Sequence, residues 1–418
     1  MKKITSLLIF FLSFSLFGQD KLSLEDCYLL LKKNYPLVHQ NELLANQNKL
    51  DVAVIKTDKL PKLDLLAQAT YQSDVTKMPI AIPNNPAEAL NKDQYKVNVS
   101  INQLIYNGGL IETSTSAKIA DLKIRQQQIE VSLYQLLNRV NQLYFSLLLH
   151  QEKKALLTSK KNLLDVKLKE IKSGIKYGML LPTSDKIIDV ELLKIRQQLT
   201  EIELSSKNLT STLSAIIGAE ITTNTQLQTP EILTNLSDEI QRPETALFDL
   251  QKSQVNAFKN VIAKKNHPKI FGFATGGYGN PGLNMLENSF QTYYITGIKL
   301  NWEVFDWNKS KKEQESIQIN NDIIDNQQEI FKLNTSIELE QQLSEIEKLS
   351  STINDDKQII ELRKEILATA DSQLKNGIIT ASAYITELTN LYEAENNLRT
   401  HKIQLQLAKA NYKTIKGN

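Results

Sequence analysis

Hydrophobic positions along the chain follow two different periods, and each change of period marks a boundary between predicted elements. From about residue 110 to 173, apolar residues recur at spacings of three and four without a proline, which is typical of a long helix with a coiled-coil seam. Between 62 and 72, and again between 94 and 105, apolar and polar residues alternate. This alternation predicts strands with one apolar face. The clearest part of the helical seam consists of Leu133, Leu137, Val140, Tyr144 and Leu147.

These periods predict a short helix followed by a helix, two strands, a long helix and a return helix, and the last five elements then occur a second time. Gly174, Gly178 and Pro182 interrupt the helical pattern in the first half, and Gly377 does so in the second, as glycine and proline commonly do. The ranges predicted for the first half are 22–34, capped by Ser23, 37–60, 62–72, 94–105, 110–173 and 183–217. Those predicted for the second half are a helix to 266, strands at 269–278 and 291–305, a long helix to 375 and a return helix to 414.

The two halves of the chain are related by an internal duplication. Residues from Pro36 to Tyr71 recur at a constant offset of 207, and residues from Tyr95 to Gly218 recur at an offset of 199. The copies therefore differ in length between the two strands, where we expect an exposed loop. We divide the chain into a signal peptide at 1–19, a first repeat at 20–218 with its hairpin at 62–105, a linker at 219–242, and a second repeat at 243–418 with its hairpin at 269–305.

The strands bear on the compartment and on the number of copies. Each is about ten residues long, the length of a tilted strand that crosses a membrane. Four strands from one chain cannot close a barrel, and lipid does not tolerate an open sheet edge. Several chains must then share one barrel, and three would supply twelve strands. We therefore predict a mainly α fold with a β-barrel contribution from each chain.

The N-terminus has the features of a secretory signal peptide. Lys2 and Lys3 precede an apolar stretch from Leu7 to Phe17, and Gly18-Gln19 follows as a plausible cleavage region. The plainer interpretation is a buried helix start. The single cysteine, Cys27, follows Glu25 and Asp26, which argues against acylation, and we expect it to be a buried residue of a short helix.

Composition gives no sign of a cofactor or of catalysis. Lys and Arg total 49 and Asp and Glu 47, with a net charge of +2, so nothing points to nucleic acid. No two histidines lie at a metal-binding spacing, and no nucleophile, base and acid form a catalytic group. The glycine-rich segment 276–282 lacks the Lys-Ser/Thr of a phosphate-binding loop, and we expect a loop at a barrel tip. The four histidines are His39, His150, His267 and His401.

Short motifs occur where one predicted element passes into the next. They are Leu22-Ser23-Leu24-Glu25-Asp26 with Asn34-Tyr35-Pro36, Leu60-Pro61-Lys62-Leu63, Gln103-Leu104-Ile105-Tyr106-Asn107-Gly108-Gly109, and Lys375-Asn376-Gly377-Ile378. In the order, doubling and spacing of these motifs, the chain resembles the TolC family of outer-membrane efflux proteins over essentially all of its mature length.

The resemblance implies a homotrimer with a twelve-stranded β-barrel in the outer membrane of a diderm bacterium and a helical tunnel across the periplasm. In that family the tunnel tip meets an inner-membrane pump, of the RND, ABC or MFS type, through a periplasmic adaptor protein. The implied function is a passive exit duct for small molecules or polypeptides in a tripartite efflux or type I secretion system. No cofactor and no enzymatic activity are implied.

The strand-to-helix turns depart from the family pattern. We expect these turns at Pro61, Asn107, Gly108 and Gly109 in the first copy, and at Pro268 and Asp306 in the second. Leu104 stands where the family often has proline. The second copy reads Glu303-Val304-Phe305-Asp306-Trp307-Asn308, without glycine, so this turn must reach its geometry in another way.

The two helical reversals are the expected contacts of the adaptor protein. The residues concerned are Gly174, Gly178, Pro182, Gly377 and Ile378. Members of the family constrict this end with rings of aspartate, and the acidic candidates here are Asp185, Asp189 and Glu387. The alternative is that these are solvated charges near helix starts, where the helix dipole favours them.

Two other classes of protein share some of these features. A secreted coiled-coil stalk or adhesion protein would explain the helices and the signal peptide, but it would not explain four alternating strands. A periplasmic adaptor would need one helical hairpin between compact β domains, whereas this chain predicts two hairpins in tandem.

Overall fold

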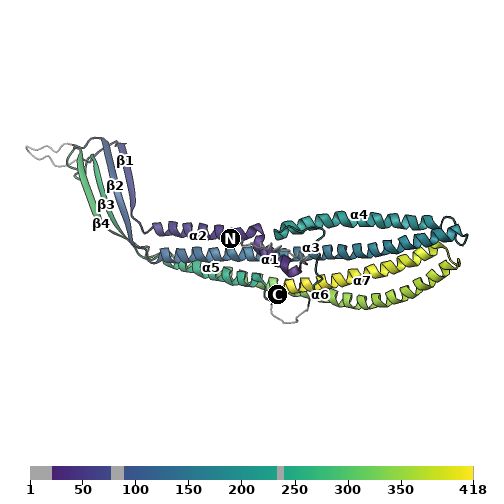
Figure 1. The fold of residues 1–418 in the computed structure, drawn as a ribbon. Coiled ribbons are helices and arrows are strands. Elements are labelled where there is room, and N and C mark those ends of the chain that lie inside the picture. Colours follow the sequence, from purple (N-terminus) through teal and green to yellow (C-terminus); the bar gives the residue numbers. More distant parts are fainter. Residues whose placement is uncertain (1–20, 77–88, 233–239, 418) are drawn as a thin grey trace, which may run out of the picture. The chain divides into compact units, whose positions relative to one another are not determined.

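A computed structural model describes residues 21–76, 89–232 and 240–417, and the predicted signal peptide at 1–19 lies outside this part of the chain. The fold is mainly helical with four strands, as the sequence predicts (Figure 1). The first-half elements are α1 (Leu24–Asn34), a short 3-10 turn, α2 (Gln40–Thr57), β1 (Lys62–Tyr71), β2 (Asp93–Tyr106), α3 (Leu110–Lys176) and α4 (Ser184–Ile217). The second-half elements are α5 (Pro243–Lys265), β3 (Lys269–Asn280), β4 (Gln291–Asn301), α6 (Lys309–Lys375) and α7 (Ala381–Lys416).

The chain forms two compact units that cut across the sequence repeats. The helical unit contains Met1–Val38, Glu130–Pro243 and Lys332–Asn418, and the sheet unit contains His39–Ile129 and Glu244–Phe331. The long helices α3 and α6 each contribute residues to both units. Each unit therefore combines parts of the first and the second repeat.

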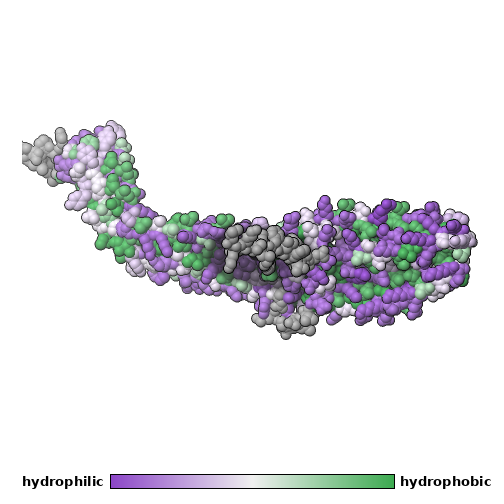
Figure 2. Space-filling model, in the orientation of Figure 1, coloured by the Kyte–Doolittle hydropathy of each residue, from purple (hydrophilic) through white to green (hydrophobic). Residues whose placement is uncertain are grey.

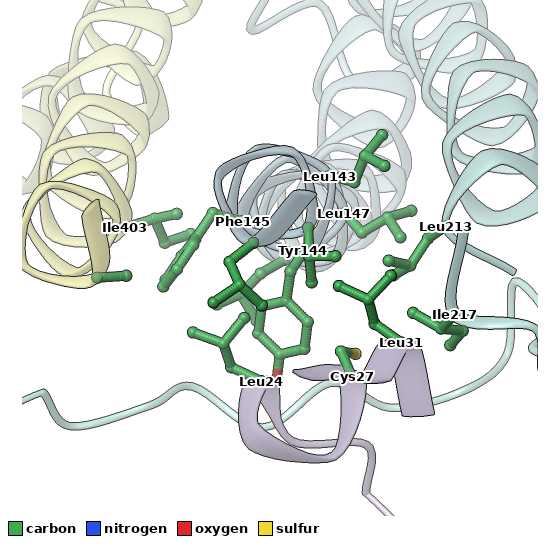
Figure 3. Packing of buried hydrophobic residues seen from close by; sticks show 14 of the residues in the cluster. Leu24, Cys27, Leu31, Leu143, Tyr144, Phe145, Leu147, Leu213, Ile217 and Ile403 are labelled. Atoms are coloured by element: carbon green, nitrogen blue, oxygen red, sulfur yellow. The ribbon is translucent and has the colours of Figure 1, made fainter. Parts of the chain in front are cut away.

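Tyr144 of α3 is at the centre of one hydrophobic core in the helical unit. Its side chain is fully buried among Leu24, Cys27 and Leu31 of α1 and residues of α3 and α4 (Figure 3). The Tyr144 hydroxyl lies 2.8 Å from the carbonyl oxygen of Leu22 and 2.6 Å from that of Gln228. A buried hydroxyl needs such a partner. All five residues of the predicted seam are buried as well.

Two caps fix the ends of helices in this core. Ser23 and Asp26 form a capping box at the start of α1, with backbone-to-side-chain hydrogen bonds of 3.1 Å in each direction. Gly218 ends α4 in the left-handed conformation, with φ 62°. A Cβ at Gly218 would lie 2.6 Å from Cβ of Asn34, whose amide donates to the carbonyl of Ile217. Only glycine fits this position without a shift of the neighbouring chain.

Several boundaries differ from the prediction: the helix predicted at 37–60 is a 3-10 turn at Pro36–His39 followed by α2 at Gln40–Thr57. β4 ends at Asn301 rather than near 305. Asn301 pairs with Lys269, the first residue of β3. Pro268, which precedes Lys269, has no N–H with which to continue the ladder. Gly276–Asn280 belong to β3 rather than to a loop, since β2 and β4 pair with both edges of this segment. Gly174 lies inside α3, which continues to Lys176, because the left-handed residue after this helix is Gly178, with φ 73°.

Candidate functional site

The four strands form one antiparallel sheet in the order β1-β2-β3-β4. Both hairpins have the same register once the repeat offsets are applied: Leu63 is opposite Ile101 in the first, and Ile270 is opposite Leu300 in the second. In the described part of the chain, β1 and β4 each have a single neighbouring strand. The sheet therefore has two open edges.

One face of the sheet is apolar and exposed. Leu65 is 74% exposed, Ile298 76% and Tyr294 80%, and Figure 2 shows apolar surface on the strands. An exposed apolar face of this size usually marks a surface that contacts protein or lipid. The large side chains on this face are Leu63, Leu65 and Tyr71 of β1, Tyr95, Val97, Val99 and Ile101 of β2, Tyr278 of β3, and Tyr294, Ile298 and Leu300 of β4.

Aromatic residues occur at both ends of the apolar face. Phe290 stacks on Tyr278 and Tyr95 at ring-centroid distances of 5.3 and 6.2 Å. This is the end of the sheet at which β3 ends and β2 and β4 begin. At the other end, Phe305 and Trp307 follow β4, and their rings meet edge to face at 4.8 Å. An apolar band between two groups of aromatic side chains is typical of the lipid-facing surface of membrane strands.

The opposite face is largely polar. The Tyr293 hydroxyl donates to the side-chain oxygen of Asn98, and Thr275 and Ser100 form a hydrogen bond of 3.3 Å between neighbouring strands. The Tyr293 ring lies over Gly277, where a Cβ would come within 2.6 Å of the ring. The polar members of this face are Asp64, Gln68, Lys96, Asn98, Ser100, Asn102, Thr275 and Lys299.

The two strand-to-helix turns reach the same backbone geometry with different residues. In the first copy, Gly108 and Gly109 have φ of 69° and 84°. At the equivalent positions of the second copy, Trp307 and Asn308 have φ of 53° and 59°, which is uncommon for a residue other than glycine and costs free energy. The absence of glycine from this turn can be seen in the sequence, but the left-handed conformation of Trp307 and Asn308 cannot.

Asp306 stabilises the second turn. Its carboxylate accepts hydrogen bonds from the backbone N–H of Ser310 at 2.9 Å and from the side chain of Asn266 at 2.5 Å. In the first copy, the side-chain oxygen of Asn107 accepts a hydrogen bond from the N–H of Gly109, at 3.1 Å. The other predicted turn residues, Pro61 and Pro268, directly precede β1 and β3.

The reversals between α3 and α4 and between α6 and α7 lie side by side in the helical unit. Gly178 and Gly377 take left-handed conformations with φ of 73° and 70°. A Cβ at Gly377 would lie 3.4 Å from the carbonyl oxygen of Met179. Of the other residues predicted here, Pro182 precedes α4 and Ile378 is 70% exposed.

Gly174 acts by close packing rather than by unusual backbone geometry. The N–H of Met179 donates to its carbonyl oxygen at 2.8 Å, which closes the end of α3. A Cβ at Gly174 would lie 2.8 Å from Cδ1 of Leu180. The turn therefore folds back over this glycine.

Two buried lysines close to these reversals connect the helices, and sequence analysis missed both. Lys160 of α3 lies 2.8 Å from Glu191 of α4, and Lys167 lies 2.6 Å from Asp371 of α6. The lysine side chains are only 6% and 7% exposed. The sequence does contain a signal for them, because two lysines occupy positions of a helical seam that are otherwise apolar. The members of this seam, spaced 3, 4, 3, 4, are Leu157, Lys160, Leu164, Lys167 and Ile171.

The acidic gate candidates each have a polar or basic neighbour. Lys186 lies between Asp185 and Asp189, at 3.5 and 3.4 Å. Glu387 lies 3.3 Å from Arg363. Paired carboxylates of this kind are common near helix starts, and the acidic gate stays a prediction.

Across residues 21–76, 89–232 and 240–417, no group of three His, Cys, Asp or Glu side chains could hold a metal ion. None of the helices in the same ranges combines the length and the apolar composition needed to cross a membrane.

Solved structures resemble this chain over most of its length. The outer membrane channel CmeC of Campylobacter jejuni has 15% identity and a TM-score of 0.63, and the match covers 94% of this chain and 85% of that one. The outer membrane protein VceC of Vibrio cholerae has 12% identity and a TM-score of 0.65, with coverage of 94% and 96%. The MtrE outer membrane channel of Neisseria gonorrhoeae, in its open state, has 14% identity and a TM-score of 0.66, with coverage of 94% and 89%.

These likenesses show that the chain has the fold of these outer membrane proteins. They confirm, for a single chain, the mainly helical fold with a few strands that the resemblance to the TolC family predicts. No model of a protein family and no curated protein sequence matches the chain.

We predict that Asp371→Asn lowers the free energy of unfolding of the helical unit by about 1–2 kcal/mol at neutral pH, because Lys167 stays buried with a weaker partner. Partial burial raises the pKa of the Asp371 carboxyl, but hydrogen bonds from Lys167 and Lys375 outweigh it and hold the pKa below the ordinary 3.8. A carboxylate with a lowered pKa stabilises the fold above its unfolded pKa, and this stabilisation is lost as the pH falls through the folded pKa.

The difference in thermal unfolding between wild type and Asp371→Asn, followed by circular dichroism in detergent, should therefore be constant from about pH 5 to 9 and shrink below about pH 4. Glu361→Gln is the matched control, since Glu361 forms an exposed pair with Lys364 at 3.0 Å and such pairs contribute little. Equal losses in both variants, or a difference unchanged in acid, would contradict this role of Lys167.

Proposed function

We propose that this chain is the outer-membrane exit duct of a tripartite efflux or type I secretion system. One observation carries the proposal: an antiparallel sheet that exposes an apolar face and has two open edges, in a chain with the fold of outer membrane channels. In water such a face favours aggregation. In a membrane it contacts lipid, and the edges must then pair with other strands.

Three copies of the chain would close the sheet into one barrel of twelve strands, an even number within the usual range. The polar face would then line the lumen. Lys96, Asn98 and Ser100 of β2 alternate with the apolar residues of the same strand, and a polar lumen lets hydrated solutes pass without entering lipid. The proposed location is the outer membrane of a diderm bacterium, with the helices in the periplasm.

The paired helical reversals are the proposed contact of a periplasmic adaptor protein, which would connect the duct to an inner-membrane pump. Gly178 and Gly377 hold these reversals in a conformation that other residues reach only with strain. Acidic residues Asp185, Asp189 and Glu387 near the same end would restrict passage while the duct is at rest.

A secreted coiled-coil stalk or adhesion protein is the alternative function. The buried helical seams fit that class equally well. The exposed apolar face and the aromatic residues at its two ends favour the membrane duct.

A pair of arginine substitutions tests which face of the sheet meets lipid. We predict that Leu65→Arg, on the apolar face, destabilises the membrane-inserted state by about 2–4 kcal/mol and lowers the yield of protein in the outer membrane fraction. Gln68→Arg, on the polar face of the same strand, should insert normally. Membrane fractionation and heat-modifiable migration on gels measure both variants. Equal yields of both variants in the membrane, or recovery of wild type as a soluble protein, would count against the duct.

The adaptor contact is tested at the reversals. We predict that Gly178→Val and Gly377→Val impair export, because a β-branched residue in the left-handed conformation distorts the turn. In the native host lacking the wild-type gene, each variant should be present in the outer membrane but fail to restore growth on a panel of toxic dyes and detergents. Normal export by both variants would rule out this role of the turns.

A further inference from the structure

We propose that one end of the polar face of the sheet binds organic anions, and that the duct therefore favours cargo with a negative charge beside an apolar group. This helix end of the sheet is where β1 and β3 begin and where β2 and β4 end. Its binding residues are Lys62, Lys269, Lys299 and Phe271. The inference rests on the proposed function, because the lumen of a duct is what exposes this face to cargo. It goes further by naming the chemical class of the cargo.

The charged residues of the four described strands lie almost entirely on the polar face. Asp93, the first residue of β2, is the one that the register places on the apolar face. The charged residues on the polar face are Lys62, Asp64, Lys96, Lys269 and Lys299. Four lysines and one aspartate give this face a net charge of +3, whereas the whole chain has a net charge of +2. Positive charge is therefore concentrated on the face that we assign to the lumen.

Both repeats have a lysine as the first residue of their first strand. Lys62 follows Pro61 and Lys269 follows Pro268, and the repeat offset of 207 carries one lysine onto the other. Three copies of the chain would thus bring six such lysines to the helix end of the barrel. Rings of lysine or arginine make pores selective for anions. A passage lined by one sign of charge also raises the local concentration of the opposite ion.

Most lysines of the polar face have no carboxylate partner. Lys62 pairs with Asp58 at 3.0 Å. Within the part of the chain that the structure describes, Lys96, Lys269 and Lys299 take part in no ion pair. The positive charge of this face is therefore available to a solute in the lumen.

Two of the unpaired lysines are neighbours at the helix end. Lys269 lies opposite Asn301, and Lys299 lies opposite Phe271. The two lysines are thus diagonal neighbours on the same face of the sheet, with Cα atoms about 7–8 Å apart. Like charges at this distance repel each other, and an anion bound between them would neutralise that repulsion.

A cavity at the same end provides apolar surface beside the lysines. Its volume is about 250 Å³, and Lys62 and Lys269 both line it. Phe271 and Leu104, which lie opposite each other on β3 and β2, line it as well. Small-molecule sites are mostly apolar, with a few polar groups that fix the orientation of the ligand. The cavity suits a molecule whose anionic group meets the lysines while its apolar part contacts Phe271.

The charge of this site is measured with a cysteine and two reagents of opposite charge. Asn301→Cys places a thiol on the polar face, opposite Lys269 and close to Lys299. In the protein purified in mild detergent, we predict that the anionic reagent sulfonatoethyl methanethiosulfonate is favoured over the cationic trimethylammonioethyl reagent. The ratio of their rates should be about tenfold higher than for a small thiol in solution.

Removing either lysine should weaken this preference. Lys269→Gln and Lys299→Gln should each lower the ratio about threefold, and salt at about 1 M should abolish the preference because the Debye length falls to about 3 Å. Lys49→Gln is the matched control, since Lys49 is exposed on α2 outside the sheet and the substitution removes the same charge. Native Cys27 is fully buried, so the wild-type protein is the blank.

The outcomes separate the inference from the proposed function. Asn102→Cys, opposite Lys62, repeats the measurement should Asn301→Cys fail to fold. Modification without a preference for the anion would overturn the inference and leave the duct intact. If neither reagent reaches either thiol in the folded protein, the face is not in a water-filled lumen, and the proposed function is contradicted.

The apolar part of the ligand has its own readout. Asn102 lines the cavity, so naphthalenesulfonate should protect Asn102→Cys from a neutral thiol reagent. Methanesulfonate, which has the same charge and no ring, should protect about tenfold less. Phe271→Ala should remove the difference between the two sulfonates, and Lys269→Gln should weaken protection by both. Phe258→Ala, an exposed aromatic residue on α5 of the sheet unit, is the matched control and should change neither.

Equal protection by the two sulfonates would overturn the apolar part of the site. Protection by neither sulfonate would overturn the binding site itself, even where the two charged reagents show the expected preference.

Discussion

The structure depends on one constraint, the hydrogen bonding of backbone groups at the edges of the sheet. In lipid, each unpaired N–H or C=O costs several kcal/mol. Among the described residues, β1 and β4 each pair with one strand, while one face of the sheet exposes leucine, isoleucine and tyrosine. A sheet with these properties is stable in a membrane only when its edges meet other strands. The need for several copies, the closed barrel and the polar lumen all follow from this requirement.

The duplication gives the two copies the same backbone geometry, and their residues have diverged at the strand-to-helix turns and at the buried lysines. Both copies keep glycine at the helical reversals, where Gly178 and Gly377 have nearly equal φ values. The strand-to-helix turns have diverged, with glycines in the first copy and Trp307 and Asn308 in the second. The buried lysines have diverged too, because the positions equivalent to Lys160 and Lys167 are Ile359 and Ile366.

Much of the fold could be predicted from the sequence because helical and strand periods are local signals. The seam at Tyr144 is buried, and both hairpins lie where alternation predicts them. The errors arose where neighbouring segments decide the structure: β2 and β4 make Gly276–Asn280 a strand, and Pro268 ends the pairing of β4. The contacts of Lys160 with Glu191 and of Lys167 with Asp371 join distant segments, and a single sequence gives no measure of such distances.

The most direct test of the account is the mass of the native protein after extraction from the outer membrane in mild detergent. Native mass spectrometry should give three chains in one particle, which would supply the twelve strands of a closed barrel. A single chain, or a protein recovered without detergent from the soluble fraction, would contradict the account, because both sheet edges would then be open.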